Sequence, residues 1–109
     1  VYLGTHDNDT TAGWFKNLSE SEKEKLFLYA GIKNGDDVVE RMIDLAMESV
    51  ADICILSMQD VLGLGSQARI NTPSTLGNNW QFRMKKQNTD SIAERLAKKT
   101  EVYGRGKIE

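Results

Sequence analysis

Two short apolar segments constrain the fold of this chain more than any motif in it. Residues 1–3, "VYL", are hydrophobic and stop at a glycine, and residues 53–58, "ICILSM", form a nearly unbroken apolar run. Both patterns are typical of strands, and the second suits a parallel strand covered on both faces. Two parallel strands alone leave edges and faces uncovered that normally lie inside a larger sheet. The sequence therefore predicts an α/β piece of a larger array.

Capping signals predict the first helix. Ser19 precedes Glu22 by three residues, which is the spacing of a capping box, and Gly31 is a natural stop for a helix. We therefore expect a helix over residues 20–30.

Two further helices are predicted from apolar residues at three- and four-residue spacing. One follows the cap candidates Asp36 and Asp37, and the other follows Thr89 or Asp90 and ends near Val102. The apolar stripe of the first comprises Val39, Met42, Ile43, Ala46 and Val50, and that of the second Ile92, Ala93, Leu96 and Ala97.

The composition excludes several kinds of partner. The net charge is −2, with acidic residues interspersed among Lys and Arg, so the clustered positive charge that nucleic-acid binding needs is missing. No stretch approaches the roughly 20 apolar residues of a membrane span, and no signal-peptide pattern opens the chain. Cys54 is the only cysteine, which indicates a reducing compartment, and we expect a cytoplasmic protein. A sugar or another neutral ligand fits this composition best.

The densest polar motif is "GTHDNDTTAGWF", directly after the first candidate strand. His6 and Asp7 stand where α/β barrels place the side chains that do chemistry. A carboxylate there can bind sugar hydroxyls and stabilise an oxocarbenium-like transition state, and an imidazole can donate to the same hydroxyls. The simpler interpretation is that such groups only satisfy loop backbone. Asp9 or Thr10 is expected to cap the turn that follows.

Two other kinds of site fit these residues less well. His6, Asp7 and Asp9 could bind a divalent ion by ligand type, but no second histidine or carboxylate cluster supports a metal site, and we expect none. The segment "GLGSQA" has the spacing of a dinucleotide fingerprint and follows a candidate strand. Four residues separate that strand from Gly63, however, and Pro73 interrupts the region where a helix should follow.

A long loop is predicted over residues 63–81, and loops of this length tend to be functional. The stretch "ARINTPSTLGNNWQFR" combines amides, aromatic rings and arginines, which are the materials of a carbohydrate site. The alternative is that Trp80 and Phe82 fill a core while Arg69 and Arg83 act as loop struts. For Trp80 the two interpretations are equally weighted.

Three of these motifs, in this order, resemble one family. "GTHDNDT", "SVADICILSMQDVLGLGSQARINTP" and "GNNWQFRM" are similar to the C-terminal part of the amylomaltases, the 4-alpha-glucanotransferases or disproportionating enzymes of glycoside hydrolase family 77. The resemblance extends from Tyr2 to about Tyr103. It implies a (β/α)8 TIM barrel of which residues 1–109 are a single C-terminal segment, with the last two strands and their helices, helix-rich in isolation. A whole barrel needs about 250 residues.

The resemblance also implies an activity and a site. The family transfers a segment of an α-1,4-glucan to the 4-hydroxyl of another glucan or glucose, with retention and without a cofactor. Asp7 matches the carboxylate that stabilises the transition state, and His6, Asn71 and Pro73 match substrate contacts. The nucleophile and the acid/base would lie on earlier strands outside this sequence. The expected partners are maltodextrin or starch-type glucans and the N-terminal remainder of the enzyme.

The alternative is a protein of another class. A free-standing small module could bind a protein partner through the apolar surface that a barrel would otherwise cover. Nucleotide binding at the glycine-rich segment is a third, weaker hypothesis. On the first hypothesis the isolated chain is inactive, because it lacks the nucleophile and the acid/base.

Overall fold

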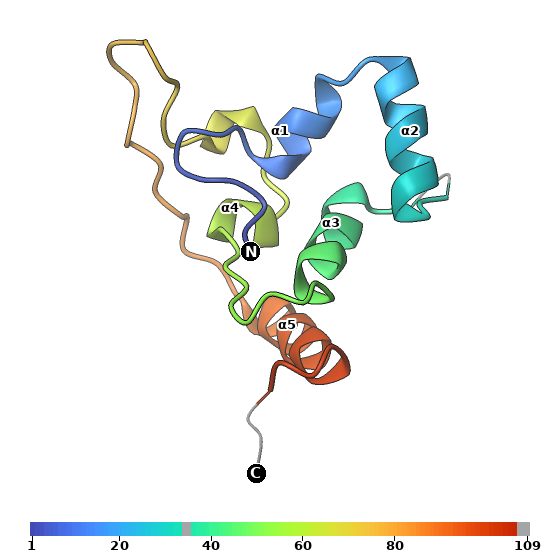
Figure 1. Cartoon of the computed structure of the whole chain (residues 1–109). Coiled ribbons are helices and arrows are strands. Elements are labelled where there is room, and N and C mark those ends of the chain that lie inside the picture. Colours follow the sequence, from blue (N-terminus) through green and yellow to red (C-terminus); the bar gives the residue numbers. More distant parts are fainter. Residues whose placement is uncertain (34–35, 107–109) are drawn as a thin grey trace.

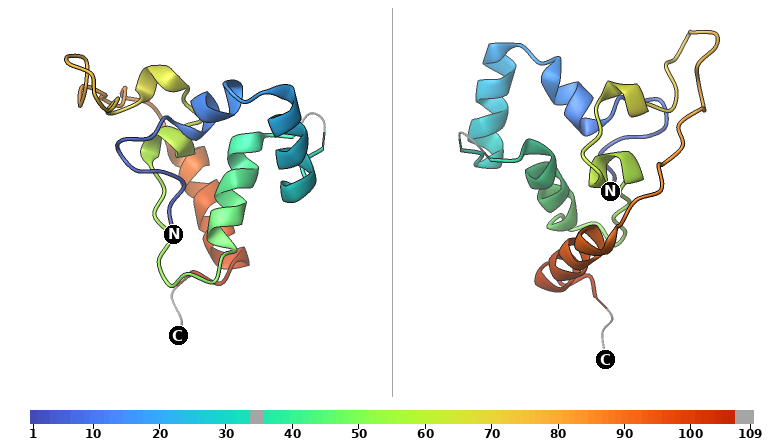
Figure 2. Two further views of the ribbon diagram at one scale, coloured as in Figure 1. Left: turned by 45° about the horizontal axis from the view of Figure 1, so that its top comes forward. Right: turned by 180° about the vertical axis from the view of Figure 1, so that it is seen from behind.

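The computed structural model describes residues 1–33 and 36–106 and is rich in helix (Figure 1). The helices, in chain order, are α1 (Thr11–Lys16), α2 (Glu20–Ala30), α3 (Val38–Met47), α4 (Met58–Val61), the 3-10 helix η1 (Ser66–Ala68) and α5 (Asp90–Val102). Helix α3 contacts α1, α2, α4 and α5, so the other helices are arranged around it (Figures 1 and 2). None of these helices is long and apolar enough to cross a membrane.

The predicted helix at residues 20–30 is confirmed at both ends. Ser19 Oγ accepts the Glu22 amide at 3.2 Å, and the Ser19 amide donates to Glu22 Oε1 at 3.0 Å, which completes the capping box. That amide lowers the pKa of Glu22, because it stabilises the ionised carboxylate. At the other end Gly31 has φ 67°, a left-handed conformation that costs glycine nothing.

The other two predicted helices are also confirmed, with one residue misplaced. Asp37 caps α3 by accepting the Glu40 amide at 3.1 Å, and Thr89 precedes α5. Helix α3 buries Ile43 among others, but it ends at Met47, so Val50 lies beyond it and is fully exposed. The four-residue spacing continued past the end of the helix, and spacing alone does not show where a helix stops.

The two segments predicted as strands pair with each other at a single β-bridge. Among the described residues the only bridge is a parallel one between Tyr2 and Ile55, where the Ile55 amide donates to the Val1 carbonyl at 2.8 Å. The prediction that the two segments lie side by side in parallel is thus confirmed, but the predicted length of the strands is wrong. Met58 begins α4, and the side chain of Ile55 is 62 % exposed instead of covered on both faces. A ladder is stabilised by neighbours on both sides, and these two segments have only each other.

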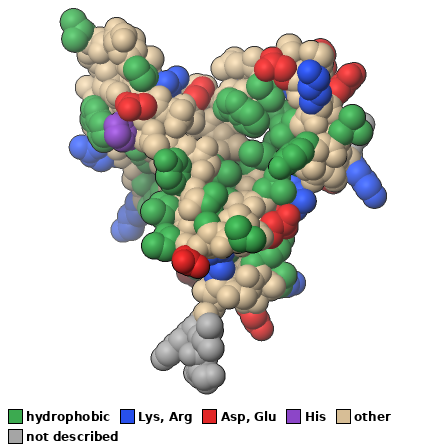
Figure 3. Space-filling view, viewed as in Figure 1, with side chains coloured by type: hydrophobic (Ala, Val, Ile, Leu, Met, Phe, Trp, Pro, Cys, Tyr) green, Lys and Arg blue, Asp and Glu red, His purple; other side chains and the backbone are tan. Residues whose placement is uncertain are grey.

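The buried core is small for a chain of this length. Ile43 is the only large side chain in the described part of the chain that is fully buried. The radius of gyration is 15.0 Å, against about 13 Å for a compact domain of this size. Apolar side chains also reach the surface around the bridge (Figure 3), namely Val1, Tyr2, Ile53, Ile55 and Met58. We call these five residues the bridge patch. An exposed apolar patch of this kind marks a contact surface.

Charged side chains attach α5 to α3. Lys99 pairs with Glu40 at 3.3 Å and with Asp44, and Arg95 pairs with Glu40 at 3.3 Å. Burial alone would lower the pKa of Lys99, but the hydrogen bond to Asp44 and the charges of Asp44 and Glu40 outweigh it and raise that pKa. Burial, together with the charges of Asp44 and Glu48, also raises the pKa of Tyr103.

Arg105, which follows α5, binds backbone carbonyls at and beyond the C-terminus of α3. Arg105 Nε donates to the Met47 carbonyl at 2.7 Å, and its Nη2 donates to Ser49 and Ala51 at 3.1 and 3.0 Å. The carbonyls at a helix C-terminus lack intrahelical partners, and a guanidinium satisfies several of them together. Arg105 thereby holds the C-terminal end of the described chain next to the segment that leads into residues 53–58.

Candidate functional site

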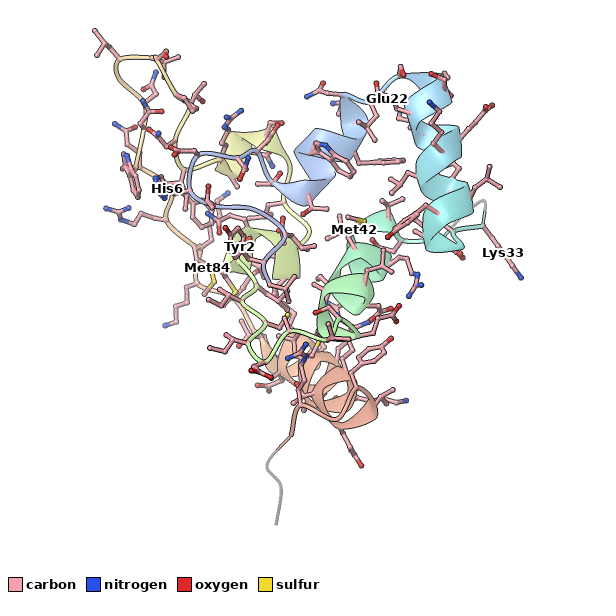
Figure 4. All side chains as sticks on the ribbon, viewed as in Figure 1. Tyr2, His6, Glu22, Lys33, Met42 and Met84 are labelled. Carbon is pink, nitrogen blue, oxygen red and sulfur yellow. The ribbon has the colours of Figure 1, made fainter. Side chains whose placement is uncertain are left out.

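A tight turn places His6 and Asp7 on the surface. The Asn8 amide donates to the Thr5 carbonyl at 3.1 Å, the Thr5 amide donates to Asn8 Oδ1 at 2.8 Å, and the Asp7 amide donates to Thr5 Oγ1 at 3.3 Å. The side chains of His6 and Asp7 are about half exposed, at 50 % and 49 %. Figure 4 shows His6 on this N-terminal loop (residues 4–10), on the side of the raised loop that follows η1.

Helix α1 anchors the far end of the N-terminal loop. Thr10 Oγ1 accepts the Gly13 amide at 3.1 Å, so Thr10 is the cap that the sequence predicted as one of two candidates. The amide of Thr11 donates to Asp60 Oδ1 at 2.8 Å. Asp60 is buried and comes from α4, 49 residues along the chain. No local pattern in the sequence predicts this second cap.

Asp9, the other candidate for this cap, instead binds the Thr10 amide and the Ser66 hydroxyl. Its Oδ1 accepts the neighbouring Thr10 amide at 2.7 Å, and its Oδ2 accepts the Ser66 hydroxyl at 2.7 Å. This contact lies against Gly13, where a Cβ would stand 2.3 Å from Ser66 Oγ. Only glycine fits between the two side chains. Asp9 and Asp60 therefore both accept structural hydrogen bonds, and neither is placed as a nucleophile.

The structure brings together three of the four residues that the sequence singled out. Asn71 Nδ2 donates to Asp7 Oδ1 at 2.6 Å, and His6 Nε2 lies 3.3 Å from Asp7 Oδ2. The Asn71 amide also donates to the His6 carbonyl at 3.1 Å. Both carboxylate oxygens of Asp7 thus have a polar neighbour while half of the side chain stays open. Pro73 lies exposed farther along the same loop and does not join this hydrogen-bonded cluster.

Arg69 links the two loops through their backbones. Its Nη2 donates to the Asp7 carbonyl at 2.8 Å, and its Nε donates to the Asn71 carbonyl at 2.9 Å. The interpretation of Arg69 as a loop strut is thus confirmed. What the sequence missed is which backbone it holds, since Asp7 lies 62 residues away.

Trp80 does not fill a core, so that one of its two interpretations is wrong. The interpretation as an aromatic face for a sugar stays a prediction. Trp80 is 57 % exposed, and its ring centroid lies 4.8 Å from that of His6 at an interplanar angle of 37°. Its amide donates to the Ile70 carbonyl at 2.6 Å, with a left-handed φ of 60° that is uncommon for a bulky residue. Such strain persists only where the surroundings hold it. Here the result is an indole packed against His6, open on part of its surface.

The loop between these residues closes on itself. Asn79 Oδ1 accepts the Thr72 amide at 2.9 Å, and the Thr75 hydroxyl donates to the Thr72 carbonyl at 2.6 Å. Leu76, on this loop, is fully exposed. The loop is the arm that rises from the molecule in Figure 1. The predicted long loop is confirmed from residue 69 onward, after the short helices α4 and η1.

The glycine-rich segment lacks the context of a dinucleotide fingerprint. Gly63 follows α4 and not a strand, and the residues up to Ala68 lead into the 3-10 helix η1 instead of a long helix. A pyrophosphate site of that class needs the strand, the tight turn and the helix N-terminus together. The nucleotide hypothesis therefore has no structural support at this segment. Within residues 1–33 and 36–106, no three His, Cys, Asp or Glu side chains gather as they would around a metal ion.

The site can therefore bind hydroxyl groups. It offers an oriented, half-open carboxylate, an imidazole and an aromatic face, which are the groups that sugars require. Comparison with known sequences decides the family, because the sequence profile described as 4-alpha-glucanotransferase matches residues 1–89.

The chain belongs to the 4-alpha-glucanotransferase family.

Curated 4-alpha-glucanotransferases are similar over nearly the whole chain. The chloroplastic/amyloplastic 4-alpha-glucanotransferase DPE1 of Arabidopsis thaliana is 43 % identical over 109 residues, covering 96 % of this chain and 19 % of the relative. The 4-alpha-glucanotransferase of Synechocystis sp. is 44 % identical over 106 residues, covering 96 % and 21 %. The chain spans about a fifth of the length of these 4-alpha-glucanotransferases.

A solved structure agrees with this assignment. The amylomaltase from Streptococcus agalactiae in complex with acarbose superposes with a TM-score of 0.91 at 34 % sequence identity. The match covers 97 % of this chain and 22 % of that chain. The arrangement of helices and loops described above is thus that of one part of a larger 4-alpha-glucanotransferase-type enzyme.

Proposed function

We propose that residues 1–109 are the C-terminal segment of the catalytic (β/α)8 barrel of a 4-alpha-glucanotransferase. Residues 1–3 and 53–58 would continue into its seventh and eighth strands. The parallel bridge between Tyr2 and Ile55 supports this position, since neighbouring barrel strands are parallel. So does the size of the chain, because a barrel needs about 250 residues and the relatives are about five times longer than this chain.

The proposed reaction is transfer of an α-1,4-glucan segment to the 4-hydroxyl of another glucan. A carboxylate nucleophile attacks the anomeric carbon while the leaving 4-oxygen takes a proton from the acid/base. In the second half, the acceptor 4-hydroxyl gives its proton to the same acid/base and displaces the nucleophile. Both of these carboxyl groups would come from the remainder of the enzyme. The isolated chain is therefore expected to be inactive.

The observation that carries the proposal is the environment of Asp7. Its carboxylate is held by the Asn71 amide at 2.6 Å, faces His6 at 3.3 Å and remains about half open. A carboxylate fixed in this way accepts hydrogen bonds from sugar hydroxyls and stabilises the positive charge that develops on the sugar ring. Asp7 is thus the proposed transition-state stabiliser, and His6, Asn71 and Pro73 are the proposed substrate contacts.

The proposed substrates are maltodextrins and starch-type α-glucans. Support comes from the family and from the amylomaltase neighbour, whose solved structure is a complex with acarbose. The cytoplasmic location remains a prediction from the single cysteine, since the Arabidopsis relative is chloroplastic/amyloplastic.

The bridge patch favours a segment of an enzyme over a free-standing module. Its members surround the Tyr2–Ile55 bridge, at the edges where further strands would pair. The remainder of the enzyme accounts for this surface without a separate protein partner.

A chimera tests the proposed function. Residues 1–109 replace the corresponding segment of the Synechocystis 4-alpha-glucanotransferase, and maltotriose is the only substrate. We expect a folded enzyme that releases glucose and forms longer maltodextrins, because this chain is 44 % identical to the Synechocystis enzyme over 106 residues. The Synechocystis enzyme without its own segment provides the inactive baseline. A chimera that does not fold would contradict the proposed position of the segment, and a folded chimera without transfer would contradict the proposed activity.

A further inference from the structure

Arg69 makes contacts that neither the family assignment nor the sequence motifs explain. Its guanidinium donates to the backbone carbonyls of Asp7 and Asn71, the two residues whose side chains meet at 2.6 Å. We infer that Arg69 is a positioning residue for glucan transfer, which holds the Asp7 carboxylate against Asn71 and so controls the rate of transfer and not the affinity for glucan. The inference rests on the proposed function.

The contacts between the two loops form a closed set. The Asn71 side chain binds the Asp7 carboxylate, the Asn71 amide binds the His6 carbonyl, and Arg69 binds the Asp7 carbonyl. Asp7 is therefore held at both ends, by its carboxylate and by its backbone, to the same three-residue stretch. If the backbone contact is lost, Asp7 itself is held to residues 69–71 only through the side-chain amide of Asn71.

Arginine is the residue type that this link requires. The Nε and Nη2 hydrogens of a guanidinium lie in one plane and point to neighbouring acceptors, so one side chain can hold two carbonyls in a fixed relation. The two distances, 2.8 and 2.9 Å, are those of well-formed hydrogen bonds. A lysine can reach one of these carbonyls but cannot reproduce the planar pair. Arg69 is itself half-buried, which favours a structural position over a solvated one.

The role through Asp7 has a kinetic signature. A transition-state group displaced by about 1 Å loses up to about a hundredfold in rate, because its orientation is part of its effect. An interaction that acts in the transition state lowers kcat and leaves KM nearly unchanged, whereas a direct contact to bound glucan raises KM. Arg69 is expected to show the first pattern.

The test compares Arg69→Met and Arg69→Lys in the chimera, with kcat and KM measured for maltotriose. We expect Arg69→Met to lower kcat about 10- to 100-fold with KM within about twofold, and Arg69→Lys to fall between. Arg83→Met is the matched control, because Arg83 Nη1 donates only to the carbonyl of its neighbour Phe82 in the described contacts. That variant should keep kcat within about twofold.

Thermal melting separates a positioning effect from unfolding. If Arg69→Met does not fold, Arg69→Lys provides the test. A lowered kcat, with KM unchanged and a melting temperature close to that of the parent, supports the inference. An unchanged kcat in a folded Arg69 variant overturns it, and so does a rise in KM alone. The unsubstituted chimera keeps the two proposals distinct, because its inactivity contradicts the proposed function, while an active chimera with an indifferent Arg69 contradicts only this inference.

Discussion

At the scale of single residues, the site depends on contacts between positions far apart in the chain. His6 and Asp7 follow each other in sequence, but Asn71, which holds the Asp7 carboxylate, lies 64 residues away. Asp60 reaches the start of α1 over 49 residues, and Asp9 reaches Ser66 over 57. The candidate site residues are thus oriented by residues that lie far from them in the sequence.

Gly13 gives a prediction at this scale. A Cβ at Gly13 would lie 2.3 Å from Ser66 Oγ and 2.6 Å from Asp9 Oδ1, which is too close for any real contact. Gly13→Ala should therefore force Asp9 and Ser66 apart and lower the free energy of unfolding by about 1–3 kcal/mol. Chemical denaturation of the chimera measures the change.

The control for this variant is Gly106→Ala, since no atom lies within 4 Å of a Cβ built at Gly106. It should change stability by less than about 0.5 kcal/mol. Equal effects of the two substitutions would show that the crowding at Gly13 relaxes freely.

The sequence predicted the candidate site residues but not the contacts that hold them in place. The pattern at His6 and Asp7, after a short apolar segment, pointed to them directly, and the family resemblance pointed to Asn71. Arg69 and Asp60 could not be assigned their contacts, because a hydrogen bond to a distant backbone group leaves no spacing rule in the sequence. Finding them required the fold.

At the scale of elements, local signals decided the helices and failed for the strands. Helix α2 begins and ends where its capping box and Gly31 indicated, because caps act within a few residues. The strand pattern of residues 53–58 depends on neighbours for its burial, and with a single parallel neighbour it pairs only at Ile55. Apolar composition indicated where the strand belongs, not how much of it forms in this chain.

The attachment of α5 to α3 predicts a loss of stability at alkaline pH. The pKa of Lys99 is raised in the folded chain, so its contribution is complete below the ordinary lysine value of 10.5 and is lost as pH rises through the raised value. The pKa of Tyr103 is also raised, and ionising it disfavours the folded state in the same pH direction.

Lys99→Met isolates the contribution of the lysine. It should lower the free energy of unfolding by about 1 kcal/mol near pH 8. The difference between variant and parent should then shrink above pH 10.5. Denaturation curves from pH 8 to about pH 11.5 measure it, and a difference that is constant across this range would contradict the assignment.

At the scale of the whole molecule, the exposed apolar surface and the small core point in the same direction. Only Ile43 is a large, fully buried side chain among the described residues, while the bridge patch remains open. A chain that covers about a fifth of its relatives cannot bury this surface by itself. On the proposed function, neighbouring strands of the enzyme would cover this surface.

A substitution at Ile55 tests whether the bridge patch is open in the isolated chain and buried in the whole enzyme. Ile55→Glu should reduce self-association of the isolated 109-residue chain in light scattering, because it places a charge in the bridge patch. In the chimera the same change should lower the melting temperature or prevent folding, since the patch is then buried. Leu28→Glu, at an exposed position on α2, is the control. An Ile55→Glu chimera as stable as the parent would contradict burial of the patch.

The most direct test of the central claim is the transfer rate of the chimera with Asp7→Asn. The amide keeps the size of the side chain but removes the negative charge that stabilises the transition state, so kcat with maltotriose should fall by about 10²- to 10³-fold while the melting temperature stays close to that of the parent. Asp52→Asn, at an exposed position outside the site, should leave the rate unchanged. A folded Asp7→Asn chimera that retains more than about half of the parent rate would contradict the role of Asp7, and with it the account of this segment as part of a glucan-transfer site.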